Sequence, residues 1–211
     1  SIEERAMAIG TGDTLRIAMR ADQQFSYNVR RENGLELKYN DEEVRVIYST
    51  DVLLTVKATK DATSKIVIEK TAEGNNSLDA KKRAQAIEYN YAFENNSLLL
   101  DGFFITDISN KYRNQQIDIT IYVPEGTVVY NDDSTNSYYS YNSNFKELNN
   151  WDSDAHYFRI LKNKVDCLDC PEEGEILEET DTLEIRKTQI KDTVSSENRS
   201  WEEEVKGNFE R

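Results

Sequence analysis

Apolar and polar residues alternate with a period of two along much of the first 170 positions. In the clearest case, Ile117, Ile119, Ile121 and Val123 are separated by polar or aromatic residues, and the run ends at Pro124-Glu125-Gly126. This alternation is typical of a strand with one buried face, and β-branched side chains favour strands. We therefore expect residues 117–123 to be a core strand that ends in a turn.

The same alternation recurs in shorter runs along the chain. Predicted strands cover residues 15–19, 35–39, 44–48, 52–58, 66–68, 98–100, 127–130, 157–161 and 165–168. Each run is expected to bury its apolar face. The sequence thus predicts a mainly β fold, and the spacing of the strands fits either a β-solenoid or an antiparallel β-sandwich.

One segment has a helical period instead. Ser77 can cap a helix, Asp79 suits the positive end of a helix dipole, and Ala80, Ala84 and Ile87 are spaced at i, i+4 and i+7. We expect a single short helix at about 78–88 that covers one end or edge of a sheet.

Two segments lack either period. Residues 131–151 are dense in Asn, Ser, Asp and Tyr, which is typical of a long loop or irregular insert. Residues 171–211 contain 13 acidic and 6 basic residues and carry half of the net charge. Such a segment can bury little apolar surface. We therefore expect a β-rich domain at 1–170 and an acidic C-terminal tail at 171–211, partly docked through Leu183 and Ile185.

Composition excludes several functions. The 211 residues have a formal net charge of −14, and no run of Lys or Arg offers a surface for nucleic acid. No stretch is long and apolar enough for a membrane span. The chain opens at Ser1 without a signal-like segment, so we expect a piece of a longer protein.

The candidate chemistry is sparse. The chain has one histidine, His156, and two cysteines, Cys167 and Cys170, in a Cys-x-x-Cys spacing. That spacing serves structural disulfides, redox couples and half zinc sites. Acidic neighbours disfavour a reactive thiolate, and zinc would need two more ligands from His156 and carboxylates. We expect a disulfide or inert thiols, no metal, no cofactor and no enzymatic activity.

Aromatic residues concentrate in the irregular insert. We assign an interaction role to Tyr138, Tyr139, Tyr141 and Trp151, because exposed aromatic rings are favoured at recognition surfaces. The alternative is that these rings fill a strand edge, since tyrosine also forms strands well.

A wider pattern runs from Val52-Leu53-Leu54 through the predicted helix to Tyr89-Asn90-Tyr91, then Asn96 to Asp101, and then Gln115 to Thr127. This order resembles the C-terminal region of PspC-domain (phage shock protein C-like) proteins of Gram-negative bacteria. The resemblance covers roughly residues 50–171 and includes Cys167 and Cys170.

The resemblance implies a membrane-anchored domain on the periplasmic, extracytoplasmic side, related to adhesin-like domains of the β-solenoid (parallel β-helix-like) type. An oxidising compartment would favour a Cys167–Cys170 disulfide. We expect a non-enzymatic envelope-stress sensing or protein-interaction domain whose partner is an envelope protein or a second copy. The alternatives are a Cys-x-x-Cys redox protein and an adhesin-like surface binding module.

Overall fold

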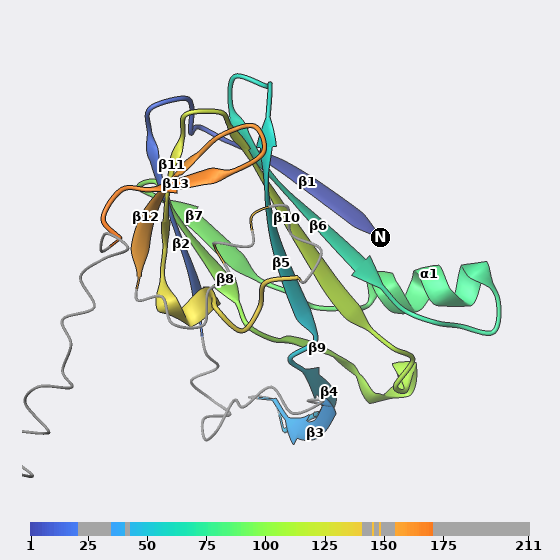
Figure 1. The fold of residues 1–211 in the computed structure, drawn as a ribbon. Helices are drawn as coiled ribbons and strands as arrows, with labels where there is room; N and C mark the ends of the chain where they lie inside the picture. The colour runs from blue at the N-terminus through green and yellow to red at the C-terminus, as the bar shows by residue number, and fades with distance from the viewer. Residues whose placement is uncertain (21–34, 41–42, 141–144, 146–147, 149–154, 171–211) are drawn as a thin grey trace, which may run out of the picture. The chain divides into compact units, whose positions relative to one another are not determined.

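The computed structural model describes residues 1–20, 35–40, 43–140, 145, 148 and 155–170 (Figure 1). Their regular elements are β1 (Ile2–Met7), β2 (Thr14–Arg20), β3 (Leu35–Tyr39), β4 (Arg45–Ser49), β5 (Val52–Thr59), β6 (Ser64–Thr71), α1 (Ser77–Gln85), β7 (Tyr91–Glu94), β8 (Ser97–Asp101), β9 (Phe104–Asp107), β10 (Gln116–Pro124), β11 (Val128–Asn131), β12 (His156–Ile160) and β13 (Val165–Cys167). The prediction of a mainly β fold with one short helix is confirmed.

The described strands form three open sheets. One sheet has the order β1-β6-β10-β5, the second β13-β12-β11-β2-β8-β7, and the third β3-β4-β9. Pairing is parallel in β5–β10, β2–β11 and β2–β8 and antiparallel in the other pairs of described strands.

The mixed pairing differs from both expected architectures. A parallel solenoid stacks each coil beside the preceding one in the same direction. Here β10 inserts between β5 and β6, parallel to one and antiparallel to the other. The antiparallel sandwich differs too, because each of the two larger sheets contains parallel pairs. Long-range insertion of a strand leaves no mark on local periodicity, so spacing alone did not predict it.

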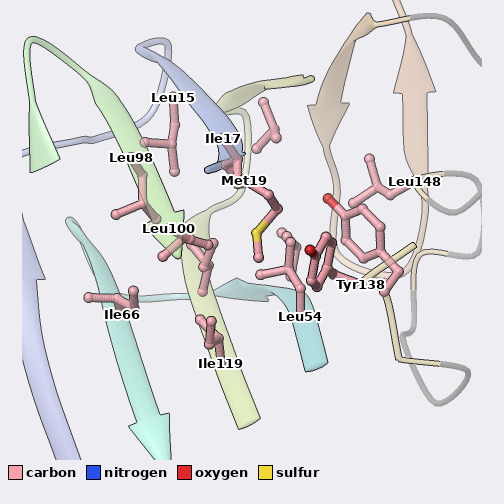
Figure 2. Packing of buried hydrophobic residues seen from close by; sticks show 14 of the residues in the cluster. Leu15, Ile17, Met19, Leu54, Ile66, Leu98, Leu100, Ile119, Tyr138 and Leu148 are labelled. Carbon is pink, nitrogen blue, oxygen red and sulfur yellow. The ribbon is translucent and has the colours of Figure 1, made fainter. Parts of the chain in front are cut away.

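The two larger sheets share one hydrophobic core (Figure 2). Ile117, Ile119, Ile121 and Val123 of β10 are each no more than 1% exposed, which confirms the predicted strand. From the other sheet, Leu15 and Ile17 of β2 and Leu98 and Leu100 of β8 join the same cluster. The strand then ends at the predicted turn, where Gly126 adopts a φ of 88° that a residue with a side chain rarely takes.

The helix is confirmed, but it spans Ser77–Gln85, so it begins one residue earlier and ends three residues earlier than expected. Asn76, not Ser77, is its N-cap, and the Asn76 side chain accepts a hydrogen bond from the Asp79 backbone N–H at 2.9 Å. Asp79 in turn pairs with Arg83 one turn later at 3.1 Å. Among the described residues, no helix has the length and apolar character needed to cross a membrane.

Three strands have no counterpart in the predicted set, namely β1, β7 and β9. Five of the six residues of β1 are exposed, so its sequence shows no buried face. It nevertheless pairs along its whole length with β6. Backbone pairing can define an edge strand with little help from apolar side chains, and a periodicity search does not detect such a strand.

Two predictions lie outside the described residues. They are the acidic tail at 171–211, with its docking residues Leu183 and Ile185, and the part of the insert that contains Tyr141 and Trp151. Both stay predictions.

The outer face of β10 carries an unfavourable charge pair. Asp118 lies directly opposite Glu69 in the antiparallel register. Partial burial, followed by the charges of Glu69 and Asp51, raises the pKa of the Asp118 carboxyl above its ordinary value of 3.8. The folded state therefore binds this proton more tightly than the unfolded chain. The ionised form thus costs stability at neutral pH, and that cost disappears as the pH falls through the raised pKa.

We expect Asp118→Asn to raise the free energy of unfolding at pH 7 by about 0.5 kcal/mol, as for removal of a like-charge cross-strand pair. Urea melts at several pH values should show the gain shrinking as the pH falls. Asp107→Ala is the control and should lower the free energy of unfolding at pH 7. Hydrogen bonds from Ser109 stabilise the ionised Asp107 carboxyl and lower its pKa. A gain at Asp118 that did not change with pH would contradict the electrostatic explanation.

Candidate functional site

The cysteines lie at the outer edge of the six-stranded sheet. Strands β12 and β13 form an antiparallel hairpin in which Phe158 faces Cys167 and Ile160 faces Val165. Phe158, Ile160 and Val165 are buried, so the hairpin is anchored on the core. We call β12, β13 and the residues up to Cys170 the cysteine hairpin.

Cys167 and Cys170 form a disulfide across the end of this hairpin, with their Cα atoms 5.6 Å apart. That separation lies within the ordinary range for a disulfide. Among the described residues no cysteine is free. Cys167 is half-buried and Cys170 is exposed, so the bond is accessible from solvent.

Asp169 and His156 complete a compact group with the two sulfurs. Nδ1 of His156 lies 3.3 Å from Oδ1 of Asp169. The same oxygen accepts a hydrogen bond from the Tyr157 backbone N–H at 2.9 Å and lies 3.7 Å from the sulfur of Cys167. One ligand atom from each of His156, Cys167, Asp169 and Cys170 falls within 4.8 Å of all the others.

The approach of these four residues depends on the hairpin register. In sequence His156 and Asp169 are thirteen positions apart, and no periodic signal links them. The backbone bond from Leu168 N–H to the Tyr157 carbonyl, at 2.8 Å, extends the hairpin and brings Asp169 beside His156. The solitary histidine and the Cys-x-x-Cys spacing were visible in the sequence, but their convergence was not.

The arrangement opposes a thioredoxin-like reactive thiolate. The Asp169 carboxylate would face the Cys167 sulfur at 3.7 Å, and a negative neighbour disfavours a thiolate. A cation bound among these groups would reverse that effect.

Two of the predicted interaction residues lie inside the molecule. Tyr138 is 8% exposed and belongs to the hydrophobic core (Figure 2). Tyr139 is 2% exposed and belongs to the same core. Their backbone extends the edge of β5, since Leu54 N–H donates to the Tyr138 carbonyl at 2.7 Å and Ser140 N–H donates to the Leu54 carbonyl at 2.9 Å. The expectation that these two rings are exposed is therefore wrong, and the strand-edge alternative describes them.

A buried polar group holds this segment in place. Tyr139 donates its hydroxyl hydrogen to Oδ1 of Asn131, and Thr135 Oγ1 lies 2.9 Å from the same oxygen. The Asn131 amide donates to the Leu148 carbonyl at 3.3 Å. Burial raises the pKa of Tyr139, so its hydroxyl stays protonated across the physiological range.

Three exposed apolar residues lie together on a different hairpin. Leu37 and Tyr39 of β3 and Val44 just before β4 are 53%, 62% and 44% exposed. We call these three residues the edge patch. The sequence predicted that β3 buries the face that carries Leu37 and Tyr39. That prediction is wrong, because the described part of the chain leaves both side chains more than half exposed. Among the described strands β3 pairs only with β4, and no other described strand lies along its second edge.

On the opposite face of β3, Lys38 packs against β4. The Lys38 ammonium lies 3.6 Å from the centre of the Tyr48 ring, and it pairs with Glu36 at 3.2 Å. Cation–π contacts of this kind stabilise a long side chain in one position. The Lys38 side chain is therefore ordered against β4, while Leu37 and Tyr39 are exposed.

Comparison with known proteins gives one match. A protein-family model described as "ToastRack found in some PspC" matches residues 38–173, which is more than half of the chain. No curated protein and no solved structure matched the chain.

Proposed function

The chain belongs to the family of toast-rack domains found in some PspC proteins, which confirms the resemblance read from its sequence, and from this membership we propose that it is a non-enzymatic protein-interaction domain. We further propose that it acts in envelope-stress sensing, on the extracytoplasmic side of a membrane-anchored PspC-like protein. The disulfide supports that location, because disulfides persist in oxidising compartments.

The observation that carries the interaction is the exposed edge patch, which lies beside an edge of β3 that no other described strand pairs with. An exposed edge strand presents unpaired backbone groups to another strand, and adjacent apolar side chains supply contact area. Natural proteins usually protect such edges, so an apolar open edge indicates a binding surface.

The partner that fits this edge best is a second copy of the chain. If two β3 strands pair antiparallel about a two-fold axis at Leu37, Glu36 of one copy lies opposite Lys38 of the other, and Leu37 faces itself. Opposite charges in directly facing positions favour pairing. A short strand gives weak association in solution, and tethering to a membrane would raise the effective concentration.

Disulfide trapping tests this geometry. In an antiparallel pair, facing Cα atoms lie about 4.5–5.5 Å apart, within reach of a disulfide. We expect Leu37→Cys to form a covalent dimer under mild oxidation, detected on a non-reducing gel. Leu78→Cys on α1 is the matched control, because Leu78 is also apolar and is 64% exposed. It should crosslink at least about tenfold more slowly, at the rate of random collision.

Charge substitutions test the register. Glu36→Lys in the Leu37→Cys background should slow trapping, because it places two lysines opposite each other, and addition of Lys38→Glu should restore it. Thermal melts should confirm that each variant folds. Equal trapping rates at positions 37 and 78 would contradict the proposed surface, and a crosslink from position 37 to a different envelope protein would replace the second copy as the partner.

A further inference from the structure

The cysteine hairpin holds a set of side chains that its disulfide does not need. His156 and Asp169 lie beside the two sulfurs, with all four ligand atoms within 4.8 Å of one another. Thiolate, imidazole and carboxylate are the groups that bind zinc in proteins. We propose that His156, Cys167, Asp169 and Cys170 bind one zinc ion when the disulfide is reduced. This inference goes beyond the proposed interaction and does not rest on it.

Two edges of a tetrahedral site are already in place. With zinc bonds of about 2.0 Å to nitrogen and oxygen and about 2.3 Å to sulfur, a tetrahedron puts N and O about 3.3 Å apart and O and S about 3.5 Å apart. The structure has 3.3 Å between His156 Nδ1 and Asp169 Oδ1 and 3.7 Å between Asp169 Oδ1 and the Cys167 sulfur. These three groups need little movement to receive the metal.

To bind zinc, the two sulfurs must also move apart. Two thiolates on one zinc ion lie about 3.8 Å apart, which is longer than a disulfide bond. The Cα atoms of Cys167 and Cys170 are 5.6 Å apart, and Cys170 is exposed at the end of the hairpin. Rotation of the Cys170 side chain can therefore open the pair without disturbing the buried residues of β12 and β13.

The backbone supports the ligands that are not sulfur. The Tyr157 N–H donates to Asp169, which holds the carboxylate toward His156. Hydrogen bonds to a ligating carboxylate are the usual second layer of a metal site. The His156 ring also contacts the Phe158 ring edge-on, with the ring centroids 6.3 Å apart. This contact helps to fix the orientation of the imidazole.

The proposed exchange balances in two steps. A dithiol reductant transfers two electrons and two protons to the Cys167–Cys170 disulfide, giving two thiols and the oxidised, disulfide form of the reductant. Zinc then binds both sulfurs, and two protons are released to solvent. The hairpin end is thus closed by a sulfur–sulfur bond under oxidising conditions and by the metal under reducing conditions.

Zinc binding by the full chain tests the site. After reduction with a phosphine, which takes up an oxygen from water as the disulfide becomes two thiols, competition with a chromogenic chelator should show one zinc ion per chain. The oxidised chain should bind none at this site. Replacement of zinc by Co²⁺ should give the intense visible bands of a tetrahedral ion and a thiolate charge-transfer band.

Matched variants decide which residues ligate. His156→Ala and Asp169→Asn should each weaken zinc binding more than about 100-fold, beyond the 10–100-fold typical of loss of a second-layer residue. Asp166→Asn is the control, because Asp166 lies in the same hairpin but pairs with Lys164 at 2.8 Å, outside the cluster. Circular dichroism should show that all three variants are folded.

Three results would overturn the proposal. They are equal zinc affinity in the oxidised and reduced chains, an octahedral cobalt spectrum without thiolate charge transfer, and unchanged affinity in both His156→Ala and Asp169→Asn.

Discussion

Ile119→Asp is expected to cost more than about 4 kcal/mol and so to leave most of the domain unfolded. Ile119 is 1% exposed at the middle of β10. It lies opposite Ile68 of β6 and beside Leu54 of β5, both of them buried. A carboxylate there would lose its hydration without gaining a partner, and such unpaired burial is among the most destabilising single changes.

Urea melts followed by circular dichroism measure this loss. Thr120→Asp is the matched control, since Thr120 is the next residue in β10, is half-buried and points to the other face. We expect the control to cost no more than about 1 kcal/mol. Similar losses in the two variants would contradict a single buried face on β10.

The second large effect is expected at Asn131, which is 3% exposed. Asn131→Leu should lower the free energy of unfolding by about 2–4 kcal/mol. The replacement removes the acceptor for the Tyr139 hydroxyl and the donor to the Leu148 carbonyl. Each buried polar group that loses its partner costs about 1–3 kcal/mol.

A double-mutant cycle separates the hydrogen bonds from packing. Tyr139→Phe alone removes only the hydroxyl and should cost about 1 kcal/mol. Combined with Asn131→Leu it removes the orphaned donor, so the double variant should be more stable than the sum of the two losses implies. Strict additivity would show that the two side chains are not coupled. Thermal or urea melts of the four proteins provide the measurement.

Ile119 and Tyr139 show where prediction from the sequence succeeded and where it failed. Strict alternation over a long run of β-branched residues predicted that Ile119 is buried, and the structure confirms this. Tyr139 lies in a segment rich in Asn and Ser, whose composition is typical of surface loops. Its burial comes from two backbone hydrogen bonds to Leu54, more than eighty positions earlier, and no local pattern reports such a contact.

The candidate sites follow the same division. The sequence identified Cys167, Cys170 and His156 as candidate ligands. It indicated nothing for Asp169 beyond its place among the acidic neighbours of the cysteines. The hairpin register placed its carboxylate against the histidine. The alternation in β3 correctly indicated a strand, but burial depends on a covering layer. Leu37 and Tyr39 are exposed on β3, at the end of the three-stranded sheet among the described strands.

By itself the sequence determined the strands with a buried face, the helix near residue 80, the turn after Pro124 and the family resemblance. These are local properties, because alternation, capping and turn preference act between residues a few positions apart. Only the tertiary structure decided that β10 lies between β5 and β6, that Tyr138 and Tyr139 are core residues, and that His156 meets Asp169. Those arrangements arise when distant segments compete for the same sheet edges and the same buried volume, and that competition is resolved only by the whole folded chain.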